Sequence, residues 1–294
     1  MINQTTRDRV AKLFAQYNEL TRGNELAIRE IAIAEISEMV YNSNAIENST
    51  LTLKDTEDIL LRDTVRKDHN IREVYEAKNL AKITTYLLDN PSSELNIEFI
   101  LSLHKMLLSG ISDNWAGRFR SGKEWVRVAG HVGANPDFVE KLMNGLVETY
   151  QKPNDSYFLE RIAWFHAEFE TIHPFNDGNG RIGRVLINQQ LANLGYPPVI
   201  IPNKGKRTDY YPAFDSYRVS GKFDNFTKLL AGLLIESLHK RIAILSATKI
   251  ITVSAWAEAN NVAGNIAANK AARGTIPAFH MREKWMISAH FKEE

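Results

Sequence analysis

The sequence predicts an all-α fold, with one short β-hairpin in the main body and a small separate unit at the C-terminus. Three observations lead to this fold class. Apolar residues recur at three- and four-residue steps through several long stretches of the chain. Only one segment of the main body, bounded by glycines, has a pattern typical of strands. Near residues 246–249 the last long helical pattern ends and a small unit begins, which indicates a domain joint.

The first helices follow from apolar spacing and from the residues that interrupt it. Leu26–Ile46 carries apolar residues at helical steps, with few helix-breaking residues before Asn42. Further helical runs are expected over residues 53–88, 96–108 and 223–245, separated by polar residues, proline or glycine. The body of the protein is therefore expected to be held together by helix packing.

Two buried helices lie in the middle of the chain. Phe158–Ile172 repeats apolar residues at helical steps and is expected to end before Pro174, because proline cannot continue a helix. Arg181–Leu194 resumes the helical pattern, and a Gly-Tyr-Pro-Pro segment closes it. The short segment between them is therefore held at both ends by buried helices.

The hairpin is expected within residues 118–128. Trp125, Val126 and Val128 lie between Gly122 and Gly130, and strands are enriched in aromatic and β-branched residues bounded by turn residues. No other segment of the main body has this pattern.

Composition excludes several classes of protein. Of the 294 residues, 44% are hydrophobic and 24% charged, as in ordinary globular proteins, and the net charge of +1 provides no global field to attract nucleic acid or an anionic membrane. The absence of cysteine excludes disulfides, thiolate metal sites and cysteine nucleophiles. No stretch has the length and hydrophobicity of a signal peptide or a membrane span, so no membrane partner is expected and the localisation is expected to be cytoplasmic.

The segment between the two buried helices has the residues of a phosphate site. Two glycines in Asp177–Gly180 at a helix start allow backbone N–H groups to face one point, where the helix dipole adds positive potential. Arg181 and Arg184 lie one turn apart and can add charge on phosphate oxygens. Asp177 offers a carboxylate suited to Mg²⁺, and His173 can accept a proton from an attacking hydroxyl.

Each of these residues also has an ordinary structural role to weigh. A glycine turn, a histidine beside proline and an aspartate beside glycine commonly serve only as turns or caps. A zinc site is the weaker functional alternative, because His166 and His173 are seven residues apart and no His-Glu-x-x-His pattern exists. All of the residues of the phosphate site lie within the twelve positions from His173 to Arg184, and the two arginines lie one helical turn apart. This concentration favours a functional site over a purely structural role.

Residues His173–Arg184 resemble the signature of the Fic family, His-Pro-Phe-x-Asp/Glu-Gly-Asn-Gly-Arg-x-x-Arg, at every fixed position. The likeness extends over about residues 45–244. It implies a Fic-type helical core in which the hairpin is a flap over the target. The resemblance suggests three parts: an N-terminal helical region over 1–94 that carries an inhibitory motif, the catalytic core over 95–245, and the terminal unit over 246–294.

The resemblance also implies roles for the residues of the signature. His173 would be the general base and Asp177 the Mg²⁺ ligand. Arg181 and Arg184 would hold the outer phosphates of ATP. The other residues expected to bind ATP or its phosphates are Pro174, Phe175, Asn176, Asp177, Gly178, Asn179, Gly180 and Tyr210, with Asn179 and the backbone of both glycines on the α-phosphate and Tyr210 beside the adenosine.

The activity implied by the resemblance is that of a protein adenylyltransferase. Such an enzyme uses ATP and Mg²⁺ to transfer AMP to a serine, threonine or tyrosine hydroxyl of a target protein. Relatives that act as kinases, or as toxins with the triphosphate reversed, tend to carry lysine at the position of Gly180, so glycine favours AMP transfer. Two alternatives stay open: a DNA-binding regulator whose Fic-like body senses nucleotide, and a transferase that uses another nucleotide such as UTP.

An upstream segment, Ser43–Asn48, resembles the inhibitory Ser/Thr-x-x-x-Glu-Gly/Asn motif of some Fic proteins. Ser43, Glu47 and Asn48 occupy its fixed positions. The resemblance implies that Glu47 pairs with Arg184 and takes the place of the γ-phosphate. The alternative is a solvated glutamate at a helix end.

The terminal unit resembles a winged helix-turn-helix domain. Thr252 or Ser254 would cap a first short helix, a turn at residues 262–264 leads into a second, and a hairpin-like end follows. Four basic residues could meet DNA phosphates: Lys270, Arg273, Arg282 and Lys284. The alternative is a docking or dimerisation module, and dimerisation through this unit would make the protein a homodimer.

Overall fold

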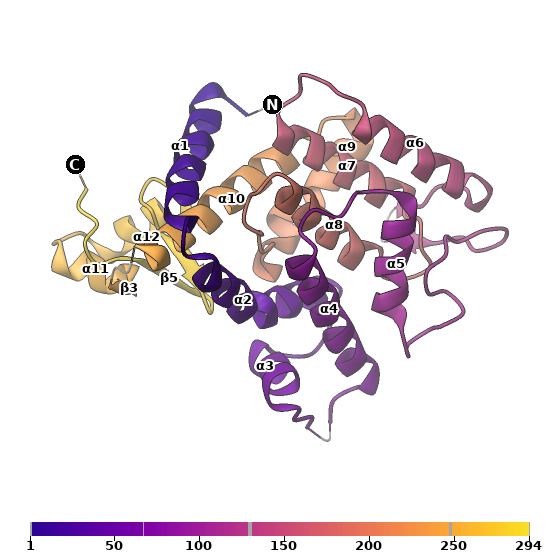
Figure 1. The fold of residues 1–294 in the computed structure, drawn as a ribbon, viewed down its shortest axis with the longest axis horizontal. Coiled ribbons are helices and arrows are strands. Elements are labelled where there is room, and N and C mark those ends of the chain that lie inside the picture. The colour runs from indigo at the N-terminus through magenta and orange to yellow at the C-terminus, as the bar shows by residue number, and fades with distance from the viewer. Residues whose placement is uncertain (1, 67, 129–130, 247–248, 294) are drawn as a thin grey trace. The chain divides into compact units, whose positions relative to one another are not determined.

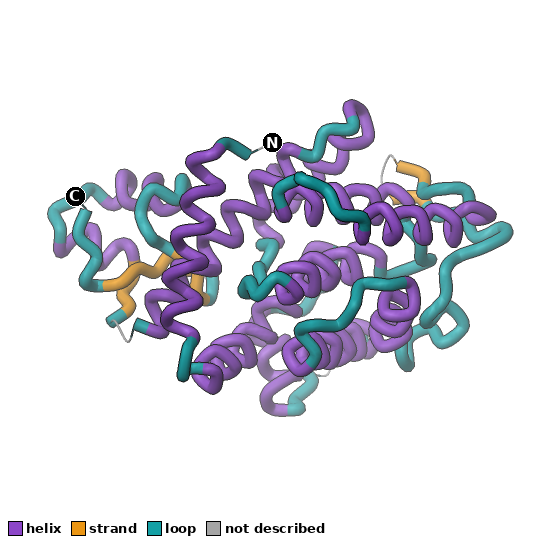
Figure 2. The backbone as a smooth tube through the Cα atoms, turned by 45° about the horizontal axis from the view of Figure 1, so that its top comes forward, coloured by secondary structure: helices purple, strands orange, loops and turns teal. Residues whose placement is uncertain are grey.

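Helices make up most of the protein, and strands are few (Figures 1 and 2). The structure is a computed structural model that describes residues 2–66, 68–128, 131–246 and 249–293. Its α-helices are α1 Gln4–Thr21, α2 Glu25–Ile46, α3 Leu53–Arg62, α4 Ile71–Asp89, α5 Ile97–Leu108, α6 Val139–Gln151, α7 Phe158–Ile172, α8 Asn179–Asn193, α9 Tyr211–Ser220, α10 Asp224–Leu245, α11 Val253–Ala259 and α12 Gly264–Ala272. Short helical turns are η1 Pro136–Phe138, η2 Asn203–Gly205 and η3 Lys206–Tyr210, and the strands are β1 Arg127–Val128, β2 His131–Val132, β3 Ile250–Thr252, β4 Phe279–Met281 and β5 Lys284–Ser288.

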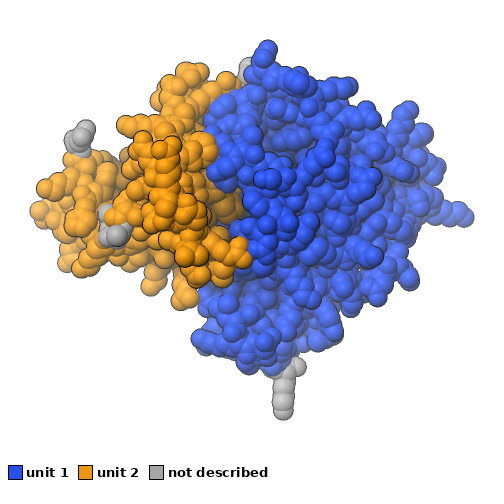
Figure 3. Space-filling model, viewed as in Figure 1, with its two compact units in different colours: residues 1, 35–196, 200–229 blue, residues 2–34, 197–199, 230–294 orange. Residues whose placement is uncertain are grey.

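The chain forms two compact units, coloured separately in Figure 3. The first holds residues 35–196 and 200–229, and the second holds residues 2–34, 197–199 and 230–294. Neither unit ends at residue 94 or 245, so the three-part division of the chain stays a prediction.

The core of the first unit surrounds α7 and α8. These helices pack against each other, and α8 also contacts α4 and α5. Phe165 and Phe169 of α7 and Ile182 of α8 are almost wholly buried in this core, as their helical spacing predicts. Burying each of these side chains contributes about 1.5–3 kcal/mol. The segment between α7 and α8 is therefore mounted on the most buried part of the unit.

The helical run expected over residues 53–88 is wrong in its middle, because the structure has two helices there. A capping box starts α3, in which the Thr52 hydroxyl accepts from the Asp55 N–H and the Asp55 carboxylate accepts from the Thr52 N–H. Asp63 then takes a left-handed conformation, with φ 48°, and ends α3. The chain restarts at α4, where the Asn70 side chain accepts from the Arg72 N–H.

The hairpin lies later in the chain than the sequence predicts. β1 and β2 pair antiparallel, with Arg127 opposite Val132. Trp125 and Val126 lie outside the strands, because residues before them are used in a turn: the Glu124 N–H donates to the Ser121 carbonyl. Ala129 and Gly130, which follow the predicted hairpin, lie outside the described residues.

The second unit contains a three-stranded antiparallel sheet in the order β3-β5-β4. Helices α11 and α12 pack on each other, and Trp256 is buried in the small core beneath them. The Thr252 hydroxyl accepts from the Ala255 N–H, which confirms the predicted cap. The predicted joint falls partly on Ala247 and Thr248, which lie outside the described residues. In the described parts of the chain, no helix is long and apolar enough to cross a bilayer.

Candidate functional site

The segment from His173 to Gly180, here called the catalytic loop, joins the end of α7 to the start of α8. His173 ends α7 in a left-handed conformation, with φ 52°, and its N–H donates to the Phe169 carbonyl at 2.9 Å. Gly178 precedes α8 with φ 82°, a conformation that glycine adopts without steric cost. Since no side chain caps α8 in the described part of the chain, its first N–H groups are available to an anion.

The Asn179 side chain braces the loop from inside. Its Oδ1 accepts from the Phe175 N–H at 2.8 Å, and its Nδ2 donates to the Phe175 carbonyl at 2.8 Å. These bonds use one hydrogen of the amide and leave its second hydrogen, so the predicted role of Asn179 on the α-phosphate stays a prediction. The Phe175 side chain is fully buried and belongs to the core, and its predicted contact with nucleotide stays a prediction.

His104 of α5 supports the loop from below. Its ring stacks on Phe175, with centroids 3.7 Å apart. The Gly117 N–H donates to Nδ1 at 3.1 Å, so the ring carries its hydrogen on Nε2, which donates to the Asp177 carbonyl at 3.1 Å. Burial lowers the pKa of His104 to about 4, which keeps the ring neutral and this pair of bonds intact at neutral pH.

Arg120 ties the loop to the chain that carries the hairpin. Its guanidinium is buried and donates to the carbonyls of Ile172 at 3.0 Å and His173 at 2.7 Å, and also to that of Ala134. The backbone N–H of Arg120 donates to the Pro174 carbonyl at 3.0 Å. Pro174, predicted to bind ATP, is buried under this brace. One side chain thus sets the backbone around the expected base.

The hairpin comes within van der Waals distance of His173. A Cβ placed on Gly133 would lie 3.2 Å from the His173 Cβ and 2.9 Å from the Arg120 guanidinium, so a side chain at this position would collide with both. The base of the hairpin is fixed by a bidentate ion pair between Arg118 and Glu124. Arg118, followed by the Ser121 N–H and the Asn176 side chain, lowers the pKa of Glu124 to about 2.

The imidazole of His173 faces a buried carboxylate. Its Nδ1 lies 3.6 Å from Oε2 of Glu170, one turn earlier on α7. Burial by itself raises the pKa of Glu170, but the two neighbouring histidines, His173 and His166, and Arg184 lower it overall, so the carboxylate is ionised. A carboxylate at Nδ1 leaves Nε2 of His173 as the nitrogen that can accept a proton.

Arg184 is bound by Ser43 and Glu47, and the contact with Glu47 is the one predicted. Its Nε donates to the Ser43 hydroxyl at 2.9 Å, and its Nη2 donates to the Ser43 carbonyl at 2.8 Å and to Glu47 Oε1 at 2.9 Å. Burial lowers the pKa of Arg184, but Tyr210 and Glu47 raise it overall. A Cβ placed on Gly180 would collide with Glu47 Oε1, so a side chain at this position would displace the carboxylate from the start of α8.

Tyr210 holds Arg184 from the opposite side. Its hydroxyl lies 2.8 Å from His166 Nε2 and accepts from Arg184 Nη1 at 3.4 Å. Its ring packs edge-on against Phe214 and is buried, and its predicted place beside the adenosine stays a prediction. Burial raises the pKa of Tyr210 and lowers that of His166 to about 4, so both groups are neutral.

The end of α2 is anchored beside the same site. Asn48 adopts φ 68°, a conformation that asparagine and glycine tolerate best, which explains the Gly/Asn position of the motif. Lys206 Nζ donates to the carbonyls of Ala45 and Ile46 and to Asn48 Oδ1. The Tyr211 hydroxyl donates to the Ile46 carbonyl at 2.7 Å. These bonds hold the helix end that carries Glu47.

Asp177 and Arg181 are also engaged. Asp177 Oδ1 accepts from its own neighbour, the Gly178 N–H, and from Arg181 Nη2 at 3.0 Å, while Oδ2 contacts Arg72 of α4. Arg181 is buried and also pairs with Glu76 of α4 at 3.0 Å. Arg181 therefore turns its charge toward carboxylates, whereas the sequence predicts contact with outer phosphates.

Asp177 fits a Mg²⁺ ligand by two observations. Its carboxylate is a hard oxygen donor, and the guanidinium of Arg72 on Oδ2 shows that the site accommodates a cation. Among the described residues, no group of three His, Cys, Asp or Glu side chains is placed to hold a metal ion. Nucleotide oxygens and water would have to complete the coordination, as is usual for Mg²⁺.

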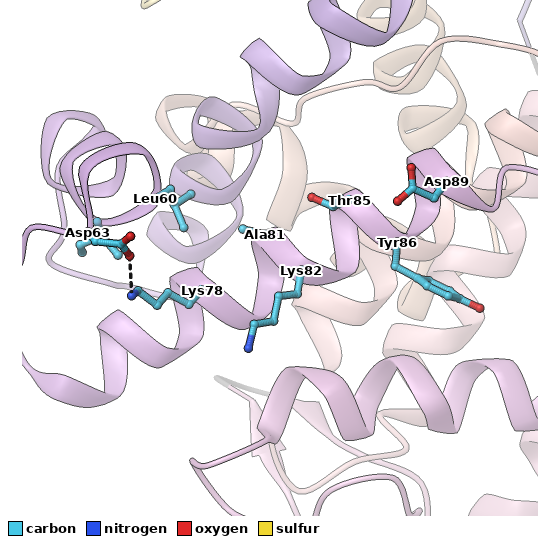
Figure 4. Close-up of a pocket in the computed structure, with 9 residues that line it drawn as sticks. Leu60, Asp63, Lys78, Ala81, Lys82, Thr85, Tyr86 and Asp89 are labelled. Atoms are coloured by element: carbon cyan, nitrogen blue, oxygen red, sulfur yellow. Dashed lines mark hydrogen bonds and ion pairs between the residues drawn. The ribbon is translucent and has the colours of Figure 1, made fainter.

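A hollow between α3 and α4 is separate from these residues (Figure 4). Lys78 reaches across it to Asp63 at 3.0 Å, and Tyr86 lines its other end. None of the predicted site residues lines it. It is therefore no candidate for the nucleotide site.

The structure brings most of the predicted site together and adds residues that the sequence did not reveal. His173, Asp177, Gly178 and Gly180 lie along one loop, with Ser43 and Glu47 against Arg184. The added residues are His104, Arg120, Glu170, Arg72 and Glu76. Of these five residues, His104 has a signal in the sequence, because it is a polar side chain among the buried apolar residues of α5.

Part of the chain is similar in sequence to known proteins. Residues 94–191 match the profile of the Fic/DOC family. The chain is 36% identical over 177 residues to Protein adenylyltransferase Fic of Nematostella vectensis, and 32% identical over 178 residues to Protein adenylyltransferase fic-1 of Caenorhabditis elegans. Each match covers 58% of the chain but only 41% and 34%, respectively, of those relatives. The chain thus spans less than half the length of the curated relatives it matches.

Solved structures share the fold. Fic-1 of C. elegans (residues 134–508) matches with a TM-score of 0.68 and 27% identity, over 80% of this chain and 71% of that one. A Fic domain containing signaling protein of Bacteroides thetaiotaomicron matches with a TM-score of 0.70 and 24% identity, over 81% of this chain and 97% of that one. With its intact loop signature and these likenesses, the chain carries a Fic/DOC domain over residues 94–191 and shares the fold of Fic proteins.

Proposed function

We propose that the protein is an adenylyltransferase that transfers AMP from ATP to a hydroxyl side chain of a target protein, and that Glu47 restrains it. The observation that carries the proposal is the catalytic loop, which joins an imidazole at the end of one buried helix to an uncapped N-terminus at the start of the next. The names of the curated relatives, protein adenylyltransferases, support the same reaction.

The chemistry assigned to each residue follows from its position. The target oxygen attacks the α-phosphorus, the bond from that phosphorus to the bridging oxygen breaks, and pyrophosphate leaves. His173 Nε2 accepts the proton of the hydroxyl, and Glu170 at Nδ1 stabilises the imidazolium that forms. The first N–H groups of α8 and the charge of Arg184 stabilise the phosphates. Mg²⁺, held through Asp177, would neutralise phosphate charge.

Glu47 explains how the same site is held inactive. Its carboxylate lies on Arg184 and beside Gly180, where a γ-phosphate would otherwise be held. A carboxylate also repels phosphate, so ATP binds in an unproductive pose while Glu47 stays in place. A charge-assisted bond of this kind contributes about 1.5–3 kcal/mol, which corresponds to about ten- to a hundredfold in occupancy.

The fate of labelled ATP tests the proposed reaction. The Glu47→Gly protein would be incubated in lysate with ATP labelled at either the α- or the γ-phosphate. Compared with the protein that carries both Glu47→Gly and His173→Ala, we expect much more α-label on protein and no additional γ-label. Transfer of the γ-label would show a kinase instead. A parallel incubation with α-labelled UTP tests the base: preferred use of UTP would contradict the assignment of ATP.

A further inference from the structure

Four charged side chains form a closed ring between α4 and the catalytic loop. Glu76 Oε1 lies 3.0 Å from Arg72 Nε and 3.0 Å from Arg181 Nη1. Asp177 lies 3.0 Å from Arg181 Nη2 through Oδ1 and contacts Arg72 through Oδ2. Each charge has two neighbours of opposite sign, and the ring is neutral without any bound ion. It contains the residue that would hold Mg²⁺.

The two arginines of the ring differ in their freedom to move. The Arg181 side chain is 3% exposed, whereas that of Arg72 is 50% exposed. Arg181 also begins from α8, which is packed against α4 and α5. Arg72 can therefore swing into solvent at small cost, while Arg181 cannot. Any opening of the ring begins at the bond between Arg72 and Asp177.

Arg72 and a divalent cation need the same oxygen. The guanidinium lies on Oδ2 of Asp177, and the other oxygen already accepts from the Gly178 N–H and from Arg181. A cation at Oδ2 would meet the charge of Arg72 at short range, which raises the cost of binding. The two cations therefore exclude each other at Asp177.

We propose that Arg72 is a positioning residue that competes with the divalent cation for Asp177 and so sets the metal concentration at which nucleotide binds productively. The inference rests on the proposed function and is separate from the restraint by Glu47, because Arg72 acts on Asp177 from α4, whereas Glu47 acts on Arg184 from the end of α2. Arg72 keeps the carboxylate oriented before metal arrives, then leaves it.

Metal binding can be measured without turnover. Mn²⁺, which is paramagnetic, would be titrated into the full chain carrying Glu47→Gly, with a non-hydrolysable ATP analogue present, and free Mn²⁺ would be followed by electron paramagnetic resonance. Arg72→Gln removes the charge, and Arg72→Lys keeps it. Arg62→Gln is the matched control, since Arg62 pairs with Asp58 at 2.7 Å on α3 and is no part of the ring.

We expect Arg72→Gln to bind Mn²⁺ about two- to fivefold more tightly, the range of a half-exposed ion pair. Arg72→Lys and Arg62→Gln should bind as the parent does. Equal or weaker binding in Arg72→Gln would overturn the proposal, and so would tighter binding in Arg72→Lys. A third substitution, Arg72→Ala, also removes the charge. Thermal unfolding of each protein shows whether the fold is kept, which separates loss of charge from loss of fold.

This outcome is independent of the proposed reaction. If Mn²⁺ binds equally to all variants while the α-label is still transferred, the competition by Arg72 is wrong and the adenylyltransferase stands. If Arg72→Gln binds Mn²⁺ more tightly but no variant transfers the α-label, the competition stands and the proposed reaction is wrong.

Discussion

The catalytic loop and the hairpin beside it are held in opposite ways. In the loop, Asn179, His104 and Arg120 together satisfy backbone groups from Ile172 to Asp177, and their side chains are buried. The hairpin has strands of two residues, and Trp125 and Val132 expose 57% and 43% of their surface. The contrast shows that the geometry for chemistry is built in, whereas the surface that would meet a target is left open.

The largest effect is expected when His173, the proposed general base in the catalytic loop, is removed. His173→Ala, made in the Glu47→Gly background, should lower the rate of AMP transfer by about 10²–10⁴-fold, because general base catalysis typically contributes that much. ATP binding and thermal stability should change little, since the imidazole is assigned to the proton and not to phosphate. Transfer rates and ATP affinity by calorimetry would check this. Near-normal transfer would remove His173 from the mechanism.

The stability that His104 contributes by supporting the loop is expected to fall in acid. The pKa of His104 is lowered from 6.5 to about 4 in the folded protein by burial. The unfolded chain takes up this proton near pH 6.5, so the stability that the neutral ring contributes is present above pH 6.5 and is lost as pH falls toward 4. The loss is about 1–3 kcal/mol.

His239 provides the matched comparison for this prediction. It lies in the second unit, and burial also lowers its pKa to about 4. His104→Gln and His239→Gln should each flatten the fall of unfolding free energy between pH 6.5 and 4, measured by urea denaturation. Only His104→Gln should alter ATP binding, because only His104 bonds to the loop. An equal effect of both variants on ATP binding would contradict the role of His104.

A smaller and more selective effect is expected in the hairpin. A short exposed edge beside His173 can pair with an extended target segment by strand addition. Val126→Pro removes a backbone donor, so modification of target protein should fall by roughly three- to tenfold, the value of one hydrogen bond. Val126→Ala, which keeps the N–H, should retain it. If Val126→Pro weakens ATP binding as much as target modification, the hairpin acts as a lid that excludes water.

Local sequence patterns predicted the two helices that carry the site. They could not predict contacts between residues that are far apart in the sequence. Phe158–Ile172 and the Asp-Gly-Asn-Gly turn encode their own structure through spacing, proline and glycine. Arg72 meets Asp177 across 105 residues, and Arg120 meets Ile172 across 52, so no local spacing links them. The hairpin was placed too early because Trp125 and Val126 have side chains typical of strands, whereas the chain just before them makes a turn in which the Glu124 N–H donates to the Ser121 carbonyl.

The contact between Glu47 and Arg184 was predicted from the resemblance to a family motif, whereas local sequence patterns could not predict it. Ser43 and Glu47 lie more than 130 residues from Arg184, yet the motif predicted the contact that the structure has. The motif did not reveal what holds it in place. Lys206 and Tyr211 anchor the end of α2 from a later segment, and their side chains give no periodic signal in the sequence.

The rate of AMP transfer by Glu47→Gly, measured beside the parent protein on α-labelled ATP, tests the central claim most directly. Removing the carboxylate frees Arg184 and the start of α8, so self-modification and target modification should rise about ten- to a hundredfold. Circular dichroism should show an unchanged fold, and productive ATP binding should tighten. A rate in Glu47→Gly that equals or falls below that of the parent would show that α2 does not restrain this enzyme.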